Sequence, residues 1–270
     1  MAMLCISPRT LAAVALDSAC PRCAWLTLRC EGKFPYAMGL PGIFSSIDAF
    51  TKREVRNHFD LYQRLPDWFP DVGKVAEMVP SRDLHWSRFF REDLETRIRL
   101  QGTPDDILRM ADGGTHIVDY KTARLTEAQD DLMPVYEIQL NGYAYIADAT
   151  GYGPVAHLSL IYFEPQTETT LAPPSCAFPA AEMFTQPVAP PSSHGPVLVR
   201  SHGAALHDLG RGGAWLEFRA RRKEVPMRGS HGIRELLVRA RALFDRADPP
   251  PATAGCEDCR RLAEIWKLLN

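Results

Sequence analysis

Apolar and polar positions along the chain follow the two-residue period of a strand in several stretches. Residues 94–100 alternate apolar or threonine side chains with charged ones, as a half-buried strand does. Residues 107–110 and 116–120 flank an Asp-Gly-Gly turn and predict a β-hairpin, because glycine supplies the positive backbone angles of a tight turn. Residues 155–163 are rich in apolar, β-branched and aromatic side chains and predict a buried strand, and residues 215–225 could form another.

Helical periods alternate with these strands. Ser7-Pro8 has the sequence of a helix start, an N-cap followed by proline, and predicts a first helix that leads into Cys20. Apolar side chains recur every three to five residues in 43–63, keep a helical spacing in 132–149, and lie on one helical face in 233–244. The order around the hairpin is strand, strand, strand, helix, strand, which predicts an α/β fold.

The composition is that of a globular protein in water. Of the 270 residues, 46% are hydrophobic and 24% are charged, and the mean hydropathy is −0.19. No stretch approaches the roughly 18 apolar residues of a membrane span, and the apolar run 10–16 is short for a signal peptide. Residues 166–196 are rich in Pro, Ala, Thr and Ser without a period, so we expect a flexible insertion within a single domain of residues 1–270.

The charge balance limits how the chain can bind nucleic acids. Lys and Arg number 31 and Asp and Glu 33, a net charge of −2, so phosphate contacts must come from a local basic patch. Residues 211–228 have a local excess of basic side chains, for which a solvated face is the alternative interpretation. A second group could stack on unpaired bases or belong to the core: Trp86, Arg88, Phe89, Phe90 and Arg91.

Asp105, Asp119 and Lys121 carry the strongest chemical signal. Two carboxylates on neighbouring strands of a hairpin can converge on one hard divalent cation. Lys121 follows Asp119 by two residues and therefore projects from the same strand face. In phosphodiester hydrolysis the cation lowers the pKa of a bound water, and the ammonium orients that water or stabilises the developing oxyanion. The alternative is an exposed strand end that carries a salt bridge.

Two C-x2-C pairs form a second constellation, Cys20 with Cys23 and Cys256 with Cys259. Four thiolates in two such pairs suit a tetrahedral Zn²⁺ site or an iron–sulfur cluster, whereas buried hydrophobes or a redox pair are the alternatives. Four protein ligands leave no open coordination position, so this centre would be structural and would join the two ends of the chain. Seven cysteines, an odd number, fit a reduced compartment better than a disulfide framework, so we expect the cytoplasm.

The carboxylate and lysine motifs resemble those of the PD-(D/E)XK nuclease superfamily, specifically its RecB-like branch. Gly102-Thr-Pro-Asp105 is similar to the Gly-x-x-Asp of the second motif, and residues 117–122 are similar to the third. Gln139 and Tyr143 match the Gln-x-x-x-Tyr of the following helix, where a spacing of four puts both side chains on one face. The predicted order of strands and helix also matches that of the superfamily core.

This resemblance implies a restriction-endonuclease-like core at about residues 94–165, with a mixed central sheet flanked by helices. It implies that Asp105 and Asp119 are metal ligands for Mg²⁺ or Mn²⁺, that Lys121 is the catalytic lysine, and that Gln139 and Tyr143 flank the site and the substrate. Asp106 is a rival for Asp105, but adjacent strand residues face opposite sides and the glycine spacing favours Asp105.

Two further metal ligands are candidates under the same resemblance. Glu95, on the preceding strand, could add a carboxylate, although a solvated strand residue is the alternative. RecB-like proteins often place a metal-binding histidine on a helix near the N-terminus, and His58 is the nearest candidate. Its context lacks the usual Gly-x-x-x-His, so an ordinary histidine is the alternative.

The cysteine pairs are similar to those of RecB-like exonucleases such as AddB and its CRISPR-associated relatives, which implies a 4Fe-4S cluster. Those relatives usually supply one cysteine from the N-terminus and three from the C-terminus. The two-plus-two arrangement of this chain departs from that pattern and keeps Zn²⁺ as the alternative.

The function that the resemblance implies is metal-dependent cleavage of DNA by an exonuclease or a single-strand or flap nuclease. Repair, recombination or phage defence would be its setting, and a helicase or another protein of that setting could be a partner. An inactive module that keeps the fold and binds nucleic acid or protein is the alternative. A zinc-dependent hydrolase is disfavoured because no H-E-x-x-H or similar motif occurs.

Overall fold

A computed structural model describes residues 3–30, 42–126, 131–166 and 218–269. The insertion expected at 166–196 lies outside the described residues from residue 167 onward. The elements follow in chain order: β1 Leu4–Ile6, α1 Pro8–Ala15, α2 Pro21–Arg29, α3 Gly42–Tyr62, β2 Val75–Met78, β3 Phe90–Asp93, β4 Ile98–Gln101, β5 Asp106–Met110, β6 Thr115–Lys121, α5 Met133–Ala149, β7 Val155–Pro165, β8 Phe218–Glu224, α6 Gly229–Phe244 and α7 Glu257–Leu269.

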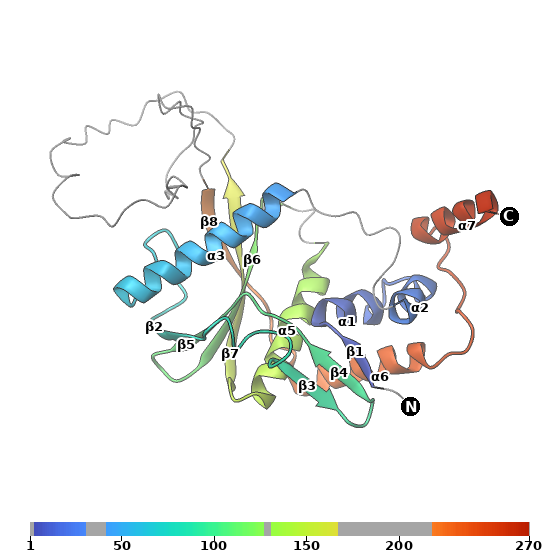
Figure 1. Cartoon of the computed structure of the whole chain (residues 1–270), viewed down its shortest axis with the longest axis horizontal. Coiled ribbons are helices and arrows are strands. Elements are labelled where there is room, and N and C mark those ends of the chain that lie inside the picture. Colours follow the sequence, from blue (N-terminus) through green and yellow to red (C-terminus); the bar gives the residue numbers. More distant parts are fainter. Residues whose placement is uncertain (1–2, 31–41, 127–130, 167–217, 270) are drawn as a thin grey trace.

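A mixed five-stranded sheet of order β2-β5-β6-β7-β8 lies at the centre of the fold (Figure 1). Strands β6 and β7 are parallel and are connected through α5, as a parallel pair requires a crossover. The other neighbouring pairs of this sheet are antiparallel. A smaller sheet of order β1-β4-β3 stands beside it. The predicted α/β class with a mixed sheet flanked by helices is therefore confirmed.

The two faces of the large sheet bury different hydrophobic cores. Ile117 packs into a core with α1, α5 and α6, whereas the adjacent Val118 packs into a core with α3 and the segment that follows it. Strand alternation therefore turns Asp119 and Lys121 toward the α5 side and Tyr120 toward the α3 side. The helices of the two cores lie on opposite sides of the sheet (Figure 1).

Most of the predicted elements are present in the structure. The Ser7 side chain caps α1 by accepting a hydrogen bond from Thr10 N–H, and Pro8 occupies the first turn, as predicted. The hairpin of β5 and β6 turns at Gly113, whose φ of +91° suits glycine. Among the described residues, no helix has the length and apolar character needed to cross a membrane.

The single strand expected at residues 94–100 is wrong, because a turn interrupts it. Residues 94–97 form a tight turn between β3 and β4, with Arg97 at a φ of +52°. The Asp93 carboxylate accepts hydrogen bonds from the Thr96 N–H and hydroxyl, both at 2.9 Å. These local bonds stabilise a turn in place of the hydrogen bonds between strands that a continuous strand would make. Leu94 is 78% exposed, which a core-facing strand residue would not be.

Candidate functional site

Asp119 and Lys121 project together from β6 at the end of the buried sheet. Asp119 is 4% exposed; one of its carboxylate oxygens forms an ion pair with Lys121 Nζ. The other accepts a hydrogen bond of 2.9 Å from Gln139 Nε2 on α5. Lys121 Nζ also lies 4.4 Å from the centre of the Tyr136 ring, a cation–π distance. The motif residues of β6 and α5 thus meet in one cluster.

Asp105 lies just before β5 and completes a carboxylate pair with Asp119. Its Oδ2 accepts a hydrogen bond of 2.7 Å from Tyr120 N–H, and its Oδ1 lies 2.7 Å from Lys52 Nζ. Burial, followed by repulsion from Asp119, raises the pKa of Asp105 to about 7, although Lys52 and Tyr120 N–H favour the charged form. Two buried carboxylates that repel each other are a donor set that suits a hard divalent cation.

Asp106 points away from this pair, as strand alternation requires. Its side chain is fully buried, accepts a hydrogen bond of 2.6 Å from the Tyr120 hydroxyl, and forms an ion pair with Arg56. Burial raises the pKa of Asp106 to about 6, against the opposing effects of Arg56 and the Tyr120 hydroxyl. Asp106 therefore anchors α3 to the sheet, and Asp105 is the one that faces Asp119.

Tyr143 lies one turn after Gln139 on α5 and packs against the glycine of the Gly-x-x-Asp motif. A Cβ at Gly102 would lie 2.7 Å from a Tyr143 ring atom and 3.2 Å from Pro8. Burial, followed by Asp119 and Asp105, raises the pKa of Tyr143 far above its ordinary value, so the hydroxyl stays protonated. The glycine thus allows the close contact that joins the two motifs.

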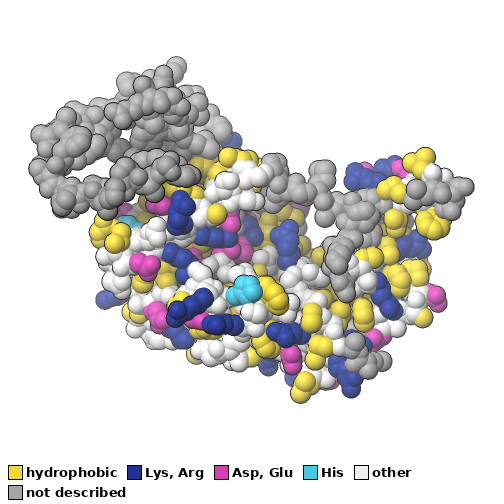
Figure 2. Space-filling view, in the orientation of Figure 1, with side chains coloured by type: hydrophobic (Ala, Val, Ile, Leu, Met, Phe, Trp, Pro, Cys, Tyr) yellow, Lys and Arg dark blue, Asp and Glu magenta, His cyan; other side chains and the backbone are white. Residues whose placement is uncertain are grey.

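A cleft of about 500 Å³ opens over Asp105 and Pro104. Figure 2 shows basic side chains around a smaller group of acidic ones on this face of the molecule. The remaining described residues that line the cleft come from α3 and from the loops before β3 and β5: Lys52, Arg53, Arg56, Asn57, Asp60, Ser81, Leu84 and Thr103.

Comparison with known protein families identifies the family to which this fold and its site belong. Residues 42–262 match the family model of the PD-(D/E)XK nuclease superfamily. The chain belongs to this superfamily. No curated protein matches the chain. Nucleases of the superfamily hydrolyse phosphodiester bonds of nucleic acids with divalent metal ions, and the match places Asp105 and Asp119 inside the nuclease region.

Two other candidate ligands of the nuclease lie away from the carboxylate pair. His58 is two residues after Arg56, about 200° further around α3, and its ring centre lies 4.6 Å from that of Tyr62, with the rings tilted by 46°. Glu95 belongs to the turn between β3 and β4 and pairs with Arg234 at 2.9 Å. The structure therefore does not bring either side chain to Asp105 and Asp119.

Lys52 and Arg56 were not singled out from the sequence, although Lys52 forms an ion pair with Asp105 and Arg56 forms one with Asp106. They are four residues apart on α3, and Asp48 precedes Lys52 by another four, at 2.6 Å. Such an i, i+4 series of charges is the available sequence signal, but it has the same pattern as a solvated helix face.

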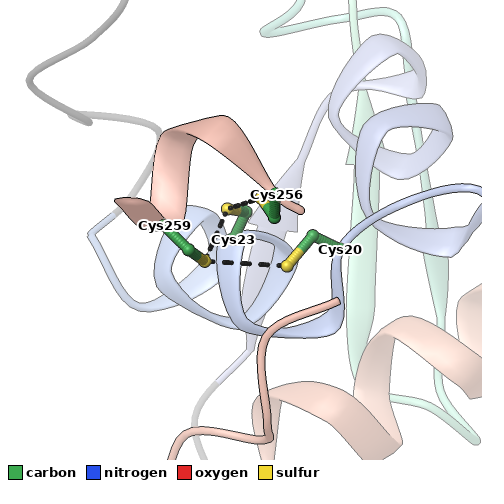
Figure 3. Close-up of side chains that lie close together, drawn as sticks. All are labelled: Cys20, Cys23, Cys256 and Cys259. Atoms are coloured by element: carbon green, nitrogen blue, oxygen red, sulfur yellow. Dashed lines mark hydrogen bonds between the residues drawn. The ribbon is translucent and has the colours of Figure 1, made fainter. Parts of the chain in front are cut away.

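The four cysteines of the C-x2-C pairs converge, as predicted. Their Sγ atoms all lie within 4.8 Å of one another, and three pairs are 3.4, 3.6 and 3.7 Å apart (Figure 3). Cys20 and Cys23 belong to the start of α2, and Cys256 and Cys259 to the start of α7. Burial alone would raise the pKa of Cys20, but backbone N–H groups of Cys23 and Thr253 and the neighbouring thiols hold it at about 6.

The two candidate nucleic-acid surfaces are only partly free. Trp86 is 49% exposed, whereas Phe89 is fully buried and Phe90 lies under Arg99 at 3.5 Å. In the basic segment, Arg222 is held by Ser159 Oγ and the Asp71 carbonyl, and Arg221 lies 3.7 Å from Glu164. Residues 211–217 of that segment lie outside the described residues.

Proposed function

We propose that the chain cleaves DNA phosphodiester bonds with Mg²⁺ or Mn²⁺ held by Asp105 and Asp119. The observation that carries this proposal is the convergence of two buried carboxylates with Lys121, next to an open cleft that Asp105 lines. The cation would supply a bound water of lowered pKa and neutralise charge on the phosphate. Oxygen ligands of this kind are those that Mg²⁺ and Mn²⁺ prefer.

Each neighbouring side chain has a task in this mechanism. The Gln139 amide fixes one oxygen of Asp119, and Tyr120 N–H fixes one oxygen of Asp105, so both carboxylates are oriented before a ligand binds. Lys121 is the cation next to Asp119 and would orient the attacking water or stabilise charge that develops on the phosphate. The link from Asp119 to Gln139 on α5 supports membership of the RecB-like branch.

An exonuclease or a single-strand or flap nuclease is the form of activity that we infer. A second groove, of about 880 Å³, shares Thr103 with the cleft over Asp105 and is lined by Trp86, Ser7 and Arg29, among others. The exposed Trp86 indole in this groove suits stacking on an unpaired base. Such substrates arise in repair, recombination and phage defence, where a helicase partner would supply them.

For the four-cysteine centre we propose a single structural Zn²⁺ rather than a 4Fe-4S cluster. A tetrahedral zinc site with Zn–S bonds of about 2.3 Å places its sulfurs about 3.8 Å apart. Three of the six separations, at 3.4, 3.6 and 3.7 Å, match that spacing, and the other pairs lie within 4.8 Å. A four-iron cluster binds each thiolate to a different iron and needs the sulfurs considerably further apart. The centre would hold the chain ends together without taking part in the reaction.

Cleavage assays on labelled single-stranded and double-stranded DNA test the proposed function. We expect the wild type to cut the single-stranded substrate with Mn²⁺ and to stop when EDTA removes the metal. Asp119→Asn should lose cleavage and keep DNA binding, because it removes a ligand charge from a site that remains folded. DNA binding by the wild type without cleavage under any divalent metal would favour the inactive binding module instead.

A further inference from the structure

Lys52 is a cation of the active site that reaches it from α3, on the opposite side of the sheet from α5. Its Nζ lies 2.7 Å from Asp105 Oδ1 and 2.6 Å from Asp48 Oδ2. The ammonium thus lies between two carboxylates, which stabilise its positive charge. The Lys52 side chain is 29% exposed, and it lines the cleft.

The ammonium contacts the oxygen of Asp105 that is not fixed by the backbone. Oδ2 is occupied by Tyr120 N–H, which leaves Oδ1 as the oxygen turned to Lys52. A divalent cation bound by Asp105 and Asp119 would compete with Lys52 for this carboxylate and would repel the ammonium. Metal binding must therefore weaken or break the contact between Lys52 and Asp105.

The surroundings of Lys52 determine where the released ammonium can go. The cleft also presents Arg53, Asn57 and Thr103, which are cations or hydrogen-bond donors, whereas the Arg56 guanidinium is held by Asp106 and the Val79 carbonyl. Such a lining suits the phosphate oxygens of a nucleic-acid backbone. The long flexible stem of lysine allows the ammonium to turn from Asp105 to a phosphate, while Asp48 keeps it near the cleft.

We propose that Lys52 is a metal-released phosphate contact, an inference that rests on the proposed nuclease function. In the metal-free protein it neutralises Asp105. When a divalent cation takes over that carboxylate, the ammonium binds a backbone phosphate of the DNA strand in the cleft. Metal and DNA then bind cooperatively, because the metal makes a phosphate-binding cation available.

Two binding measurements on Lys52→Met test this proposal without any cleavage. Calorimetric titration of the DNA-free protein with Mn²⁺ should show several-fold tighter binding than in the wild type, because the competing ammonium is gone. Titration with single-stranded DNA in Ca²⁺ should show weaker binding than in the wild type. The slope of log K against the logarithm of the salt concentration should be shallower by about 1. A merely structural lysine would not change the two affinities in opposite directions.

Matched variants make the result unambiguous. Lys74→Met removes the same charge from an exposed position before β2 and should change neither affinity. Lys52→Arg keeps a cation and should keep the wild-type salt dependence, which covers the case in which Lys52→Met folds poorly. Unchanged or weaker Mn²⁺ binding by folded Lys52→Met, or unchanged DNA binding, would overturn the role of Lys52.

A further variant separates this proposal from the nuclease assignment. Asp105→Asn should abolish Mn²⁺ binding at the site if Asp105 is a ligand. If Asp105→Asn binds Mn²⁺ as the wild type does, the proposed metal site fails and the role of Lys52 fails with it. If Asp105→Asn no longer binds Mn²⁺ while Lys52→Met binds Mn²⁺ and DNA with wild-type affinity, only the role of Lys52 is refuted.

Discussion

Gly102 connects the two halves of the site through the absence of a side chain. Tyr143 and Pro8 occupy the space that a Cβ would need, at 2.7 and 3.2 Å. Gly102 is also three residues before Asp105, so any shift that relieves a clash would move the loop that carries the carboxylate. The glycine of the motif is thus a packing requirement at a site whose geometry matters to fractions of an ångström.

Gly102→Ala should therefore reduce both stability and cleavage. The added methyl group overpacks the contact with Tyr143, at an expected cost of about 1–3 kcal/mol in the free energy of unfolding. Urea denaturation and cleavage assays measure the two effects. Gly232→Ala is the control, because its Cβ would meet only Arg228, at 3.5 Å, in the helix α6. Equal behaviour of the two variants would contradict the importance of the Gly102 contact.

Strand alternation was enough to predict which residues share a face near the site. It placed Lys121 beside Asp119 and separated Asp105 from Asp106, because both statements depend on neighbours along one strand. The contact of Lys52 with Asp105 depends on how α3 docks across the sheet. Nothing in the local pattern around residue 52 contains that information.

At the scale of elements, the turn between β3 and β4 shows how a regular pattern can hide a reversal. The alternation of residues 94–100 runs unchanged from the turn at 94–97 into β4, so the period alone does not show where the strand begins. The local signal was Asp93, whose carboxylate bonds to Thr96. The same carboxylate accepts from the Tyr145 hydroxyl at 3.2 Å and lies 3.5 Å from Arg234, which joins the hairpin to α5 and α6.

Asp93 should make the stability of this region depend on pH. Burial alone would raise its pKa, but the Thr96 hydrogen bonds, the Tyr145 hydroxyl and Arg234 hold it below the ordinary value. A lowered carboxyl pKa stabilises the folded state above the unfolded pKa of about 4, and this contribution is lost as the pH falls. Urea midpoints of the wild type should thus fall faster below pH 4 than those of Asp93→Asn. Parallel pH profiles of the two proteins would refute this role.

At the scale of the whole molecule, α2 and α7 meet through the cysteine cluster although they lie at opposite ends of the sequence (Figure 1). The paired C-x2-C spacing was enough to predict that the four thiols converge, because each pair can offer two ligands to one metal. The separations between sulfurs depend on how the two helices dock and could not be read from the sequence.

Cys256→Ser should release the metal and lower the melting temperature. Thiolate ligation contributes free energy of folding that the metal-free chain lacks. We expect elemental analysis to find about one zinc per wild-type chain, less in the variant, and no iron. Cleavage should fall because the ends of the domain are misplaced.

Cys30→Ser is the matched control for this prediction. Cys30 is exposed and lies outside the cluster, so its replacement should leave metal content and melting temperature unchanged. Wild-type metal content and stability in Cys256→Ser would show that the two pairs do not share a site. Iron in place of zinc, with the absorbance of a cluster, would restore the 4Fe-4S interpretation.

The most direct measurement of the central claim is the single-turnover cleavage rate of Lys121→Ala with saturating DNA and Mn²⁺. Lys121 contacts Asp119 and the Tyr136 ring at the end of β6, and we expect its removal to leave the fold and DNA binding intact. If it orients water or stabilises charge in the transition state, the rate should fall by about a hundredfold or more. A rate within roughly threefold of the wild type, for a folded variant that binds DNA, would contradict the account.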